Sequence, residues 1–173
     1  MSSVAHHIAF LCRRLDARML VASVENSGIP ATGSSDSQNM SRICSVLNTA
    51  VSEGQQVVTV SMLVALQTLM KRVCAGCAEI DDSSVKETRL LLWKLICGPV
   101  DSVGAQVQLE TCKVLKAGLE VFYPNAVERS ALLMLLLSEG GSTSGIVLLL
   151  DLLLTDLAEN LMNSDPEVSL KGR

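Results

Sequence analysis

Aromatic residues are scarce in this chain, which has one Trp, one Tyr and two Phe among its 173 residues. Proteins that bind single-stranded nucleic acid usually stack bases on aromatic side chains, and β-sheets are enriched in aromatic and β-branched residues. The hydrophobic residues, 49% of the chain, are instead mainly Leu, Val, Ala and Met, which favour packed helices. We therefore expect an all-α protein with no nucleic-acid partner.

A basic excess is also absent, since 14 Lys and Arg residues stand against 18 Asp and Glu, for a net charge of -4. A surface that follows phosphates usually needs more basic than acidic residues. The N-terminus lacks the basic start of a signal peptide, and Arg13 and Arg14 interrupt its apolar run. Five of the six cysteines lie in apolar helical patterns, so we expect reduced, buried thiols in a cytoplasmic or nuclear protein.

Residue groups that would carry catalysis or bind a metal are lacking. Cys74 and Cys77 form a lone CxxC motif. A zinc site needs a second pair of ligands at a suitable spacing, and a thioredoxin motif needs a βαβ setting; neither accompanies this pair. We interpret the pair as small residues near the end of a helix. The sequence therefore predicts no catalytic residue, no metal and no cofactor, and we expect a protein that is not an enzyme.

An apolar run long enough to span a bilayer is missing from the leucine-rich end of the chain. "ALLMLLL" has only seven residues, and "IVLLLDLLLTDLAENLM" carries Asp151, Asp156 and Glu159. Spanning takes about twenty largely apolar residues, and each central Asp costs roughly 2.5–3.5 kcal/mol on insertion scales. These runs are more typical of core helices. The alternative, a membrane-associated helical protein, is motivated by the leucine runs and the mean hydropathy of +0.39.

Gly, Ser, Pro and Asn residues divide the chain into about seven predicted helices. Ser84 with Glu87 fits a capping box at the start of one helix, and Gly98 is predicted to end that helix in the left-handed conformation. The predicted helices cover residues 4–24, 40–51, 55–78, 84–97, 102–122, 125–138 and 145–162. The predicted domains are an N-terminal helix (1–24), a flexible Ser/Gly-rich linker (25–39), a stack of three helical hairpins (40–163) and a loose tail (164–173).

A similar pattern begins each hairpin. Arg42, Arg89 and Arg129 each lead into an apolar helix of about three turns, then a Gly-containing stop, then a second helix. The hairpin starts are separated by roughly forty residues, which is within the range of HEAT and armadillo units. A hairpin cannot bury its apolar face alone, so stacked hairpins share a continuous core. We therefore predict an armadillo/HEAT-like stack, with an irregular helical bundle as the alternative.

Four basic residues fall on the predicted second helices: Lys71, Arg72, Lys113 and Lys116. In a stack of hairpins the second helices often line a concave face. These side chains are candidates for a modest basic strip that binds an acidic peptide of a protein partner. The alternative interpretation is that they lie on ordinary solvated helix faces.

The stretch "KAGLEVFYPNAVERSALLMLLL" joins two helices: an apolar helix ends in an aromatic pair and Pro-Asn, and Arg then leads into a leucine-rich helix. It resembles helical segments of very large ubiquitin-pathway proteins, namely the zinc-finger ZZ-type and EF-hand domain proteins and the giant HECT and HERC-type ligases. The resemblance covers only part of the chain and implies a piece of scaffold, with no catalytic residue carried over. We predict a non-enzymatic helical-repeat scaffold, or a fragment of one, that binds protein partners.

Overall fold

The computed structural model describes residues 34–138 and 144–163, and over these ranges the secondary structure is helical, with no strand. The prediction of an all-α fold is therefore confirmed for the described part of the chain. The predicted helix 1–24, residues 25–33 of the predicted linker and the tail 164–173 lie outside it. The helices are α2 (Ser34–Ser52), α3 (Gln56–Cys74), α4 (Asp82–Cys97), α5 (Val100–Val103), α6 (Ala105–Ala117), α7 (Leu119–Phe122), α8 (Ala126–Ser138) and α9 (Ser144–Asn163).

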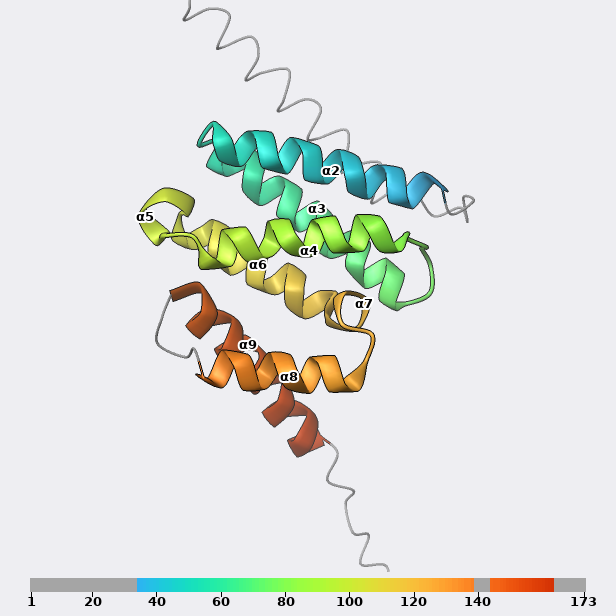
Figure 1. Ribbon diagram of the computed structural model, residues 1–173, viewed down its shortest axis with the longest axis vertical. Helices are drawn as coiled ribbons and strands as arrows, with labels where there is room; N and C mark the ends of the chain where they lie inside the picture. The colour runs from blue at the N-terminus through green and yellow to red at the C-terminus, as the bar shows by residue number, and fades with distance from the viewer. Residues whose placement is uncertain (1–33, 139–143, 164–173) are drawn as a thin grey trace, which may run out of the picture.

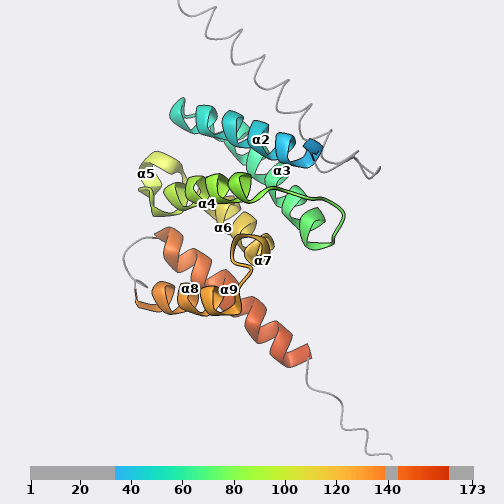
Figure 2. The ribbon, with the colours of Figure 1, turned by 45° about the vertical axis from the view of Figure 1, so that its right-hand side comes forward.

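The long helices form two layers, with α2, α4 and α8 in one and α3, α6 and α9 in the other (Figure 1). A turned view shows the same succession of helix pairs from α2/α3 through α4/α6 to α8/α9 (Figure 2). Helix α3 packs against α2 and α6, and α6 packs in turn against α9. The core lies between the two layers.

Helix α3 is the central helix of this core. Met62, Leu66 and Leu69 on it are fully buried. By length and composition it is the one helix of the described residues that could cross a membrane, and 44% of its apolar window is buried inside the structure. Core helices of soluble proteins pass the same test, so this composition does not by itself indicate a membrane segment.

Helix α2 starts at Ser34, six residues before the predicted start at Met40. The predicted linker 25–39 is therefore helical over its last six residues. Asp36 lies in the first turn, where a carboxylate interacts favourably with the helix dipole, and it is buried 3.9 Å from Arg72. This contact joins α3 to a Ser-rich part of α2 whose composition alone predicts a loop.

The single helix predicted over residues 102–122 is wrong, because two glycines divide it into α5, α6 and α7. Gly104 has a φ of +90°, which is outside the helical region and favours glycine. Gly118 lies against the core, where an added Cβ would come within 2.6 Å of the Phe122 ring and 2.8 Å of Met70 Sδ. These breaks turn the chain toward the joint that precedes α8.

The ends of α4 also differ from the predicted capping. Asp81, not Ser84, is the N-cap, and its carboxylate accepts hydrogen bonds from the Ser84 backbone N–H at 2.8 Å and from the Ser83 hydroxyl at 2.7 Å. At the other end Gly98 is extended, with φ of -69° and ψ of 152°. Pro99 follows it, and a residue that precedes proline is pushed toward extended geometry.

Candidate functional site: a groove between α4 and α8

The four predicted partner-binding residues lie on α3 and α6, as expected of second helices. Lys71 is exposed, whereas Arg72 pairs with Asp36 of α2. Lys113 Nζ lies 2.9 Å from Glu110 Oε1, and Lys116 Nζ lies 2.5 Å from Asp156 Oδ1 of α9. Acids of the same chain therefore offset most of this positive charge, and that these residues bind a partner stays a prediction.

Two arginines of the predicted repeat pattern meet at the joint between α7 and α8. Arg89 of α4 donates from Nη1 to the Phe122 carbonyl at 2.9 Å. Arg129 of α8 donates from Nη1 to the carbonyls of Tyr123 at 2.7 Å and Pro124 at 2.9 Å. Hydrogen bonds from a charged donor are stronger than neutral ones. The two side chains therefore fix the joint, and with it the position of α8 relative to α4.

The aromatic residues of the joint are held in different ways. Phe122 is buried in the core, where it fills the space beside Gly118. Tyr123 is half-buried, and its hydroxyl accepts a 2.8 Å hydrogen bond from Trp93 Nε1. The Arg89 guanidinium lies over the Tyr123 ring, 5.1 Å from its centroid, which is a cation–π contact. Tyr123 and Trp93 thus form a fixed aromatic wall beside α4.

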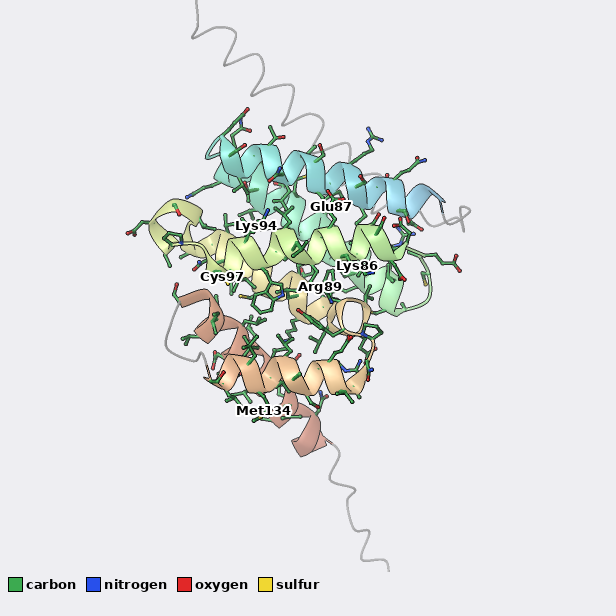
Figure 3. All side chains as sticks on the ribbon, viewed as in Figure 1. Lys86, Glu87, Arg89, Lys94, Cys97 and Met134 are labelled. Carbon is green, nitrogen blue, oxygen red and sulfur yellow. The ribbon has the colours of Figure 1, made fainter. Side chains whose placement is uncertain are left out.

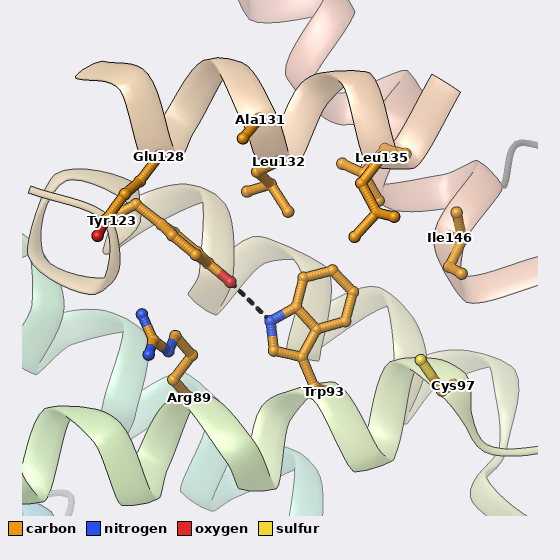
Figure 4. A pocket seen from close by; sticks show the side chains of 10 residues that line it. Arg89, Trp93, Cys97, Tyr123, Glu128, Ala131, Leu132, Leu135 and Ile146 are labelled. Carbon is orange, nitrogen blue, oxygen red and sulfur yellow. Dashed lines mark hydrogen bonds between the residues drawn. The ribbon is translucent and has the colours of Figure 1, made fainter. Parts of the chain in front are cut away.

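This wall borders a groove between α4 and α8 (Figures 3 and 4). The groove has a volume of about 890 Å³, which is within the range of small-ligand pockets. Leu132 and Leu136 at its α8 side are buried, whereas Leu135 is 55% exposed. It is lined by Arg89, Trp93, Cys97, Tyr123, Glu128, Ala131, Leu132, Leu135, Leu136 and Ile146.

Charged and apolar residues are separated along the groove. Figure 4 shows Arg89, Tyr123 and Glu128 at one end and Cys97 and Ile146 at the other. The middle is formed by leucines of α8 and the Trp93 indole. A groove with an apolar floor, a Trp and a Tyr, and one charge of each sign at its end has the composition of a protein-binding surface, where Trp, Tyr and Arg are enriched.

The prediction that the thiols are buried is wrong for three of the cysteines. Of the described thiols, Cys44 and Cys112 are buried as predicted, but Cys74, Cys77 and Cys97 are exposed, since they lie at or beyond helix ends. Burial raises the pKa of the Cys112 thiol to about 12. Burial likewise raises the pKa of Cys44, partly offset by a hydrogen bond with Thr88. Cys12 lies outside the described residues.

The CxxC pair has local partners. The Cys74 thiol donates to the Ala117 carbonyl at 3.3 Å, and the Cys77 thiol donates to the Ala75 carbonyl at 3.7 Å. Within residues 34–138 and 144–163, no group of His, Cys, Asp and Glu is arranged to hold a metal ion.

Of the groove residues, the sequence analysis singled out only Arg89 and the joint that contains Tyr123. It did not identify the others as functional. Trp93 appeared only as one letter of an apolar helix, and Leu135 as one of many leucines. One signal was available: in a chain with one Trp and one Tyr, these amphipathic residues are the ones expected at an interface. Periodicity does not reveal that α4 and α8 leave a space between them, because that depends on the joint.

Comparisons with known proteins give one informative similarity. No protein-family model matches the chain, and no solved structure matches it. The chain is 30% identical over 169 residues to the probable E3 ubiquitin-protein ligase HECTD4 of Homo sapiens. The match covers 94% of this chain but only 4% of that relative. It supports the predicted link to large ubiquitin-pathway proteins, whereas the resemblance to ZZ-type and EF-hand domain proteins stays a prediction.

Proposed function

We propose that this chain is a non-enzymatic scaffold with armadillo/HEAT-like stacking, which binds a protein partner in the groove between α4 and α8. The observation that carries the proposal is the groove itself: an apolar channel whose wall contains the chain's one Trp, held by the hydrogen bond to Tyr123. The two-layer succession of helix pairs supports the repeat assignment (Figure 1). We place the protein in the cytoplasm or the nucleus.

An apolar segment of a protein is the occupant that this groove fits best. Helical segments bind such grooves through apolar side chains spaced along one face. Arg89 and Glu128 at one end would orient the segment by pairing with its polar residues. The similarity to a probable E3 ubiquitin-protein ligase supports a role in which this chain holds a substrate or subunit within a ubiquitin-ligase-type assembly.

The test is affinity purification of the tagged chain from cells, compared between wild type and Leu135→Glu. Leu135 is 55% exposed in the groove, so the substitution places a charge there at little cost to the fold. Val57→Glu on α3 is a matched control, because Val57 is 59% exposed outside the groove. Partners that bind in the groove are lost with Leu135→Glu and kept with Val57→Glu. Equal partner sets from all three proteins refute the groove as the binding site.

Direct binding in the groove is measured with two of the residues that line it, Trp93 and Cys97. Trp93 is the only Trp of the chain, so a shift in tryptophan emission on adding a purified partner reports on the groove. A partner in the groove also protects Cys97 from a maleimide and leaves the exposed Cys77, which is not among the groove residues, reactive. A partner that binds without changing either readout binds elsewhere.

The proposal that this chain is not an enzyme is tested by an assay for a ubiquitin thioester. We expect no ubiquitin thioester on this chain when it is incubated with ubiquitin, an activating enzyme, conjugating enzymes and ATP, then analysed on a non-reducing gel. The exposed Cys74, Cys77 and Cys97 lack a general base or other activating partner among the contacts the structure gives them. A thioester that is removed by a reducing agent and lost when one of these residues is changed to Ser overturns the proposal.

A further inference from the structure

A second cleft lies on the other side of α4, between α4 and α2, and we call it the α2–α4 cleft. It has a volume of about 500 Å³. Figure 3 shows Glu87 and Lys94 on the side of α4 that faces α2, whereas Arg89 and Cys97 of the groove lie on the side that faces α8. The α2–α4 cleft is lined by Ser41, Cys44, Ser45, Asn48, Thr49, Glu87, Leu90, Leu91 and Lys94.

The α4 side of this cleft carries one charge of each sign, with two leucines between them. Lys94 follows Glu87 by seven residues, which is about 10 Å along the helix axis, and Leu90 and Leu91 share the same helix face. Glu87 and Lys94 are exposed, and among the described residues neither forms an ion pair. Leu90 is 64% exposed. This face of α4 therefore offers two charges and an apolar side chain for contact with another molecule.

The charge pattern of this face is complementary to itself. In a two-fold dimer the same patch of both copies forms the interface, so each residue of the patch meets a residue of that patch. When two copies of α4 lie antiparallel with the axis midway between Glu87 and Lys94, Glu87 of each copy faces Lys94 of the other. That midpoint falls between Leu90 and Leu91, so the leucines meet at the axis. In a parallel pair, by contrast, Glu87 would face Glu87 and Lys94 would face Lys94.

The α2 side of the cleft is compatible with this arrangement. Ser41, Ser45 and Asn48 of α2 line the cleft, and they are exposed and uncharged. Hydroxyl and amide groups can both donate and accept hydrogen bonds, so they tolerate the approach of a copy of themselves. The α2 residues of the cleft therefore oppose no like charges when two copies meet.

We infer that the α2–α4 cleft is a dimerisation surface, on which two copies of this chain pair through antiparallel α4 helices. Burial of Leu90 supplies apolar contact, and the two Glu87–Lys94 pairs set the direction and register of the helices. A contact centred on one helix of each copy is small for a protein interface, so we expect a weak dimer with a Kd of micromolar order. This dimer goes beyond the function proposed for the groove, which concerns a different protein.

The test is sedimentation velocity of the full chain at concentrations from low to high micromolar. We expect the wild type to change from monomer to dimer, with a weaker dimer at high salt. Glu87→Lys and Lys94→Glu should each weaken the dimer roughly tenfold or more, because each substitution occurs twice in a two-fold interface and opposes like charges. Val57→Gln on α3, outside the cleft, is the control and should leave the dimer unchanged. A chain that stays monomeric, or a dimer that neither charge substitution weakens, overturns the inference.

A mixture of the two single variants tests the antiparallel pairing directly. Glu87→Lys has Lys at both positions and Lys94→Glu has Glu at both, so neither variant pairs with itself but each is complementary to the other. We expect the equimolar mixture to recover the dimer, as should the double variant Glu87→Lys/Lys94→Glu. Recovery also shows that both single variants are folded. A mixture that stays monomeric while the wild type dimerises overturns the inference.

A helix of another protein is the alternative occupant of this cleft. In that case the chain stays monomeric, while a synthetic helical peptide with Lys, Leu and Glu at the matching spacing binds it and binds the Glu87→Lys chain less tightly. That result overturns the inference. Binding in the groove is measured on the Glu87→Lys chain through Trp93 emission and Cys97 labelling, so the two proposals can fail separately.

Discussion

Gly145 offers the sharpest test of how α9 is placed against α4. It is the second residue of α9, and a Cβ added there would lie 2.3 Å from the Ile96 carbonyl oxygen and 3.1 Å from its carbon. Both atoms belong to the backbone at the end of α4, so no side chain can rotate to make room. Gly145→Ala must therefore push the start of α9 away from α4.

The expected size follows from two opposing effects. Forcing an extra methyl group into a filled contact costs about 1–3 kcal/mol, whereas replacing Gly by Ala in a helix gains at most about 1 kcal/mol. With the full helix gain, the net loss is about 0–2 kcal/mol in the free energy of unfolding, which corresponds to a Tm lower by up to about 8 °C for a domain of this size. Calorimetry or a thermal melt followed by circular dichroism measures it.

The same substitution is expected to alter the groove. Ile146, the next residue of α9, lines it, so a displaced α9 changes the environment of Trp93 and shifts its emission in the free protein. Gly118→Ala is the comparison, because the nearest atoms to its new methyl group belong to the side chains of Phe122 and Met70 and not to the backbone. A Gly145→Ala protein with an unchanged or higher Tm and unchanged Trp93 emission refutes the described contact between α9 and α4.

Further expectations concern single residues. Arg89→Met should lower the free energy of unfolding by about 1.5–3 kcal/mol in denaturant titrations, since it removes a charged donor to a carbonyl of the joint; a loss below 0.5 kcal/mol contradicts this. The hydrogen bond from the Ser84 backbone N–H, and then those from the Ser83 and Ser84 hydroxyls, hold the pKa of Asp81 below its ordinary value. The stabilisation from Asp81 is therefore present above about pH 4 and is lost as the pH falls further. In melts over this acidic range Asp81→Asn should lose less stability than wild type; equal pH dependence argues against it. Cys97 should react with a thiol reagent much faster than Cys112, whose thiol is buried with a pKa of about 12, and this difference should vanish in denaturant.

The joint between α7 and α8 was accessible to sequence reasoning because its signals are local. Pro124 ends one helix, and Asn is a residue type that commonly caps the start of the next; the side-chain Oδ1 of Asn125 accepts a 3.1 Å hydrogen bond from the Val127 N–H. Helix α8 accordingly begins one residue after the predicted start. The breaks at Gly104 and Gly118 were missed, since a glycine within an apolar pattern becomes a break only through tertiary neighbours such as Phe122.

Two features depend on contacts between residues that are far apart in the sequence: the groove, and the pairing of the predicted basic residues with acids. Arg89 was recognised as part of a repeat pattern, but its hydrogen bond to Phe122 joins residues 33 positions apart. The pairing of Lys116 with Asp156 likewise brings α6 and α9 together. Residue types and spacing along one helix do not reveal contacts between different helices. The sequence alone therefore could not show which basic residues of the predicted strip are paired with acids.

Burial along the stack is uneven, and this shapes how the protein unfolds. Buried apolar side chains are most numerous on α2 and α3, whereas α8 and α9 contribute Leu132, Leu136, Ile146 and Leu149 among the described residues. In a molecule built from neighbour contacts, local opening costs least where the fewest apolar groups are sealed. The α8–α9 hairpin is thus the unit that opens first, and its amides exchange with solvent ahead of those of α3. A partner bound in the groove would contact α8 and oppose this opening. Amide hydrogen exchange would then slow throughout α8 and α9, and not only at the residues that line the groove.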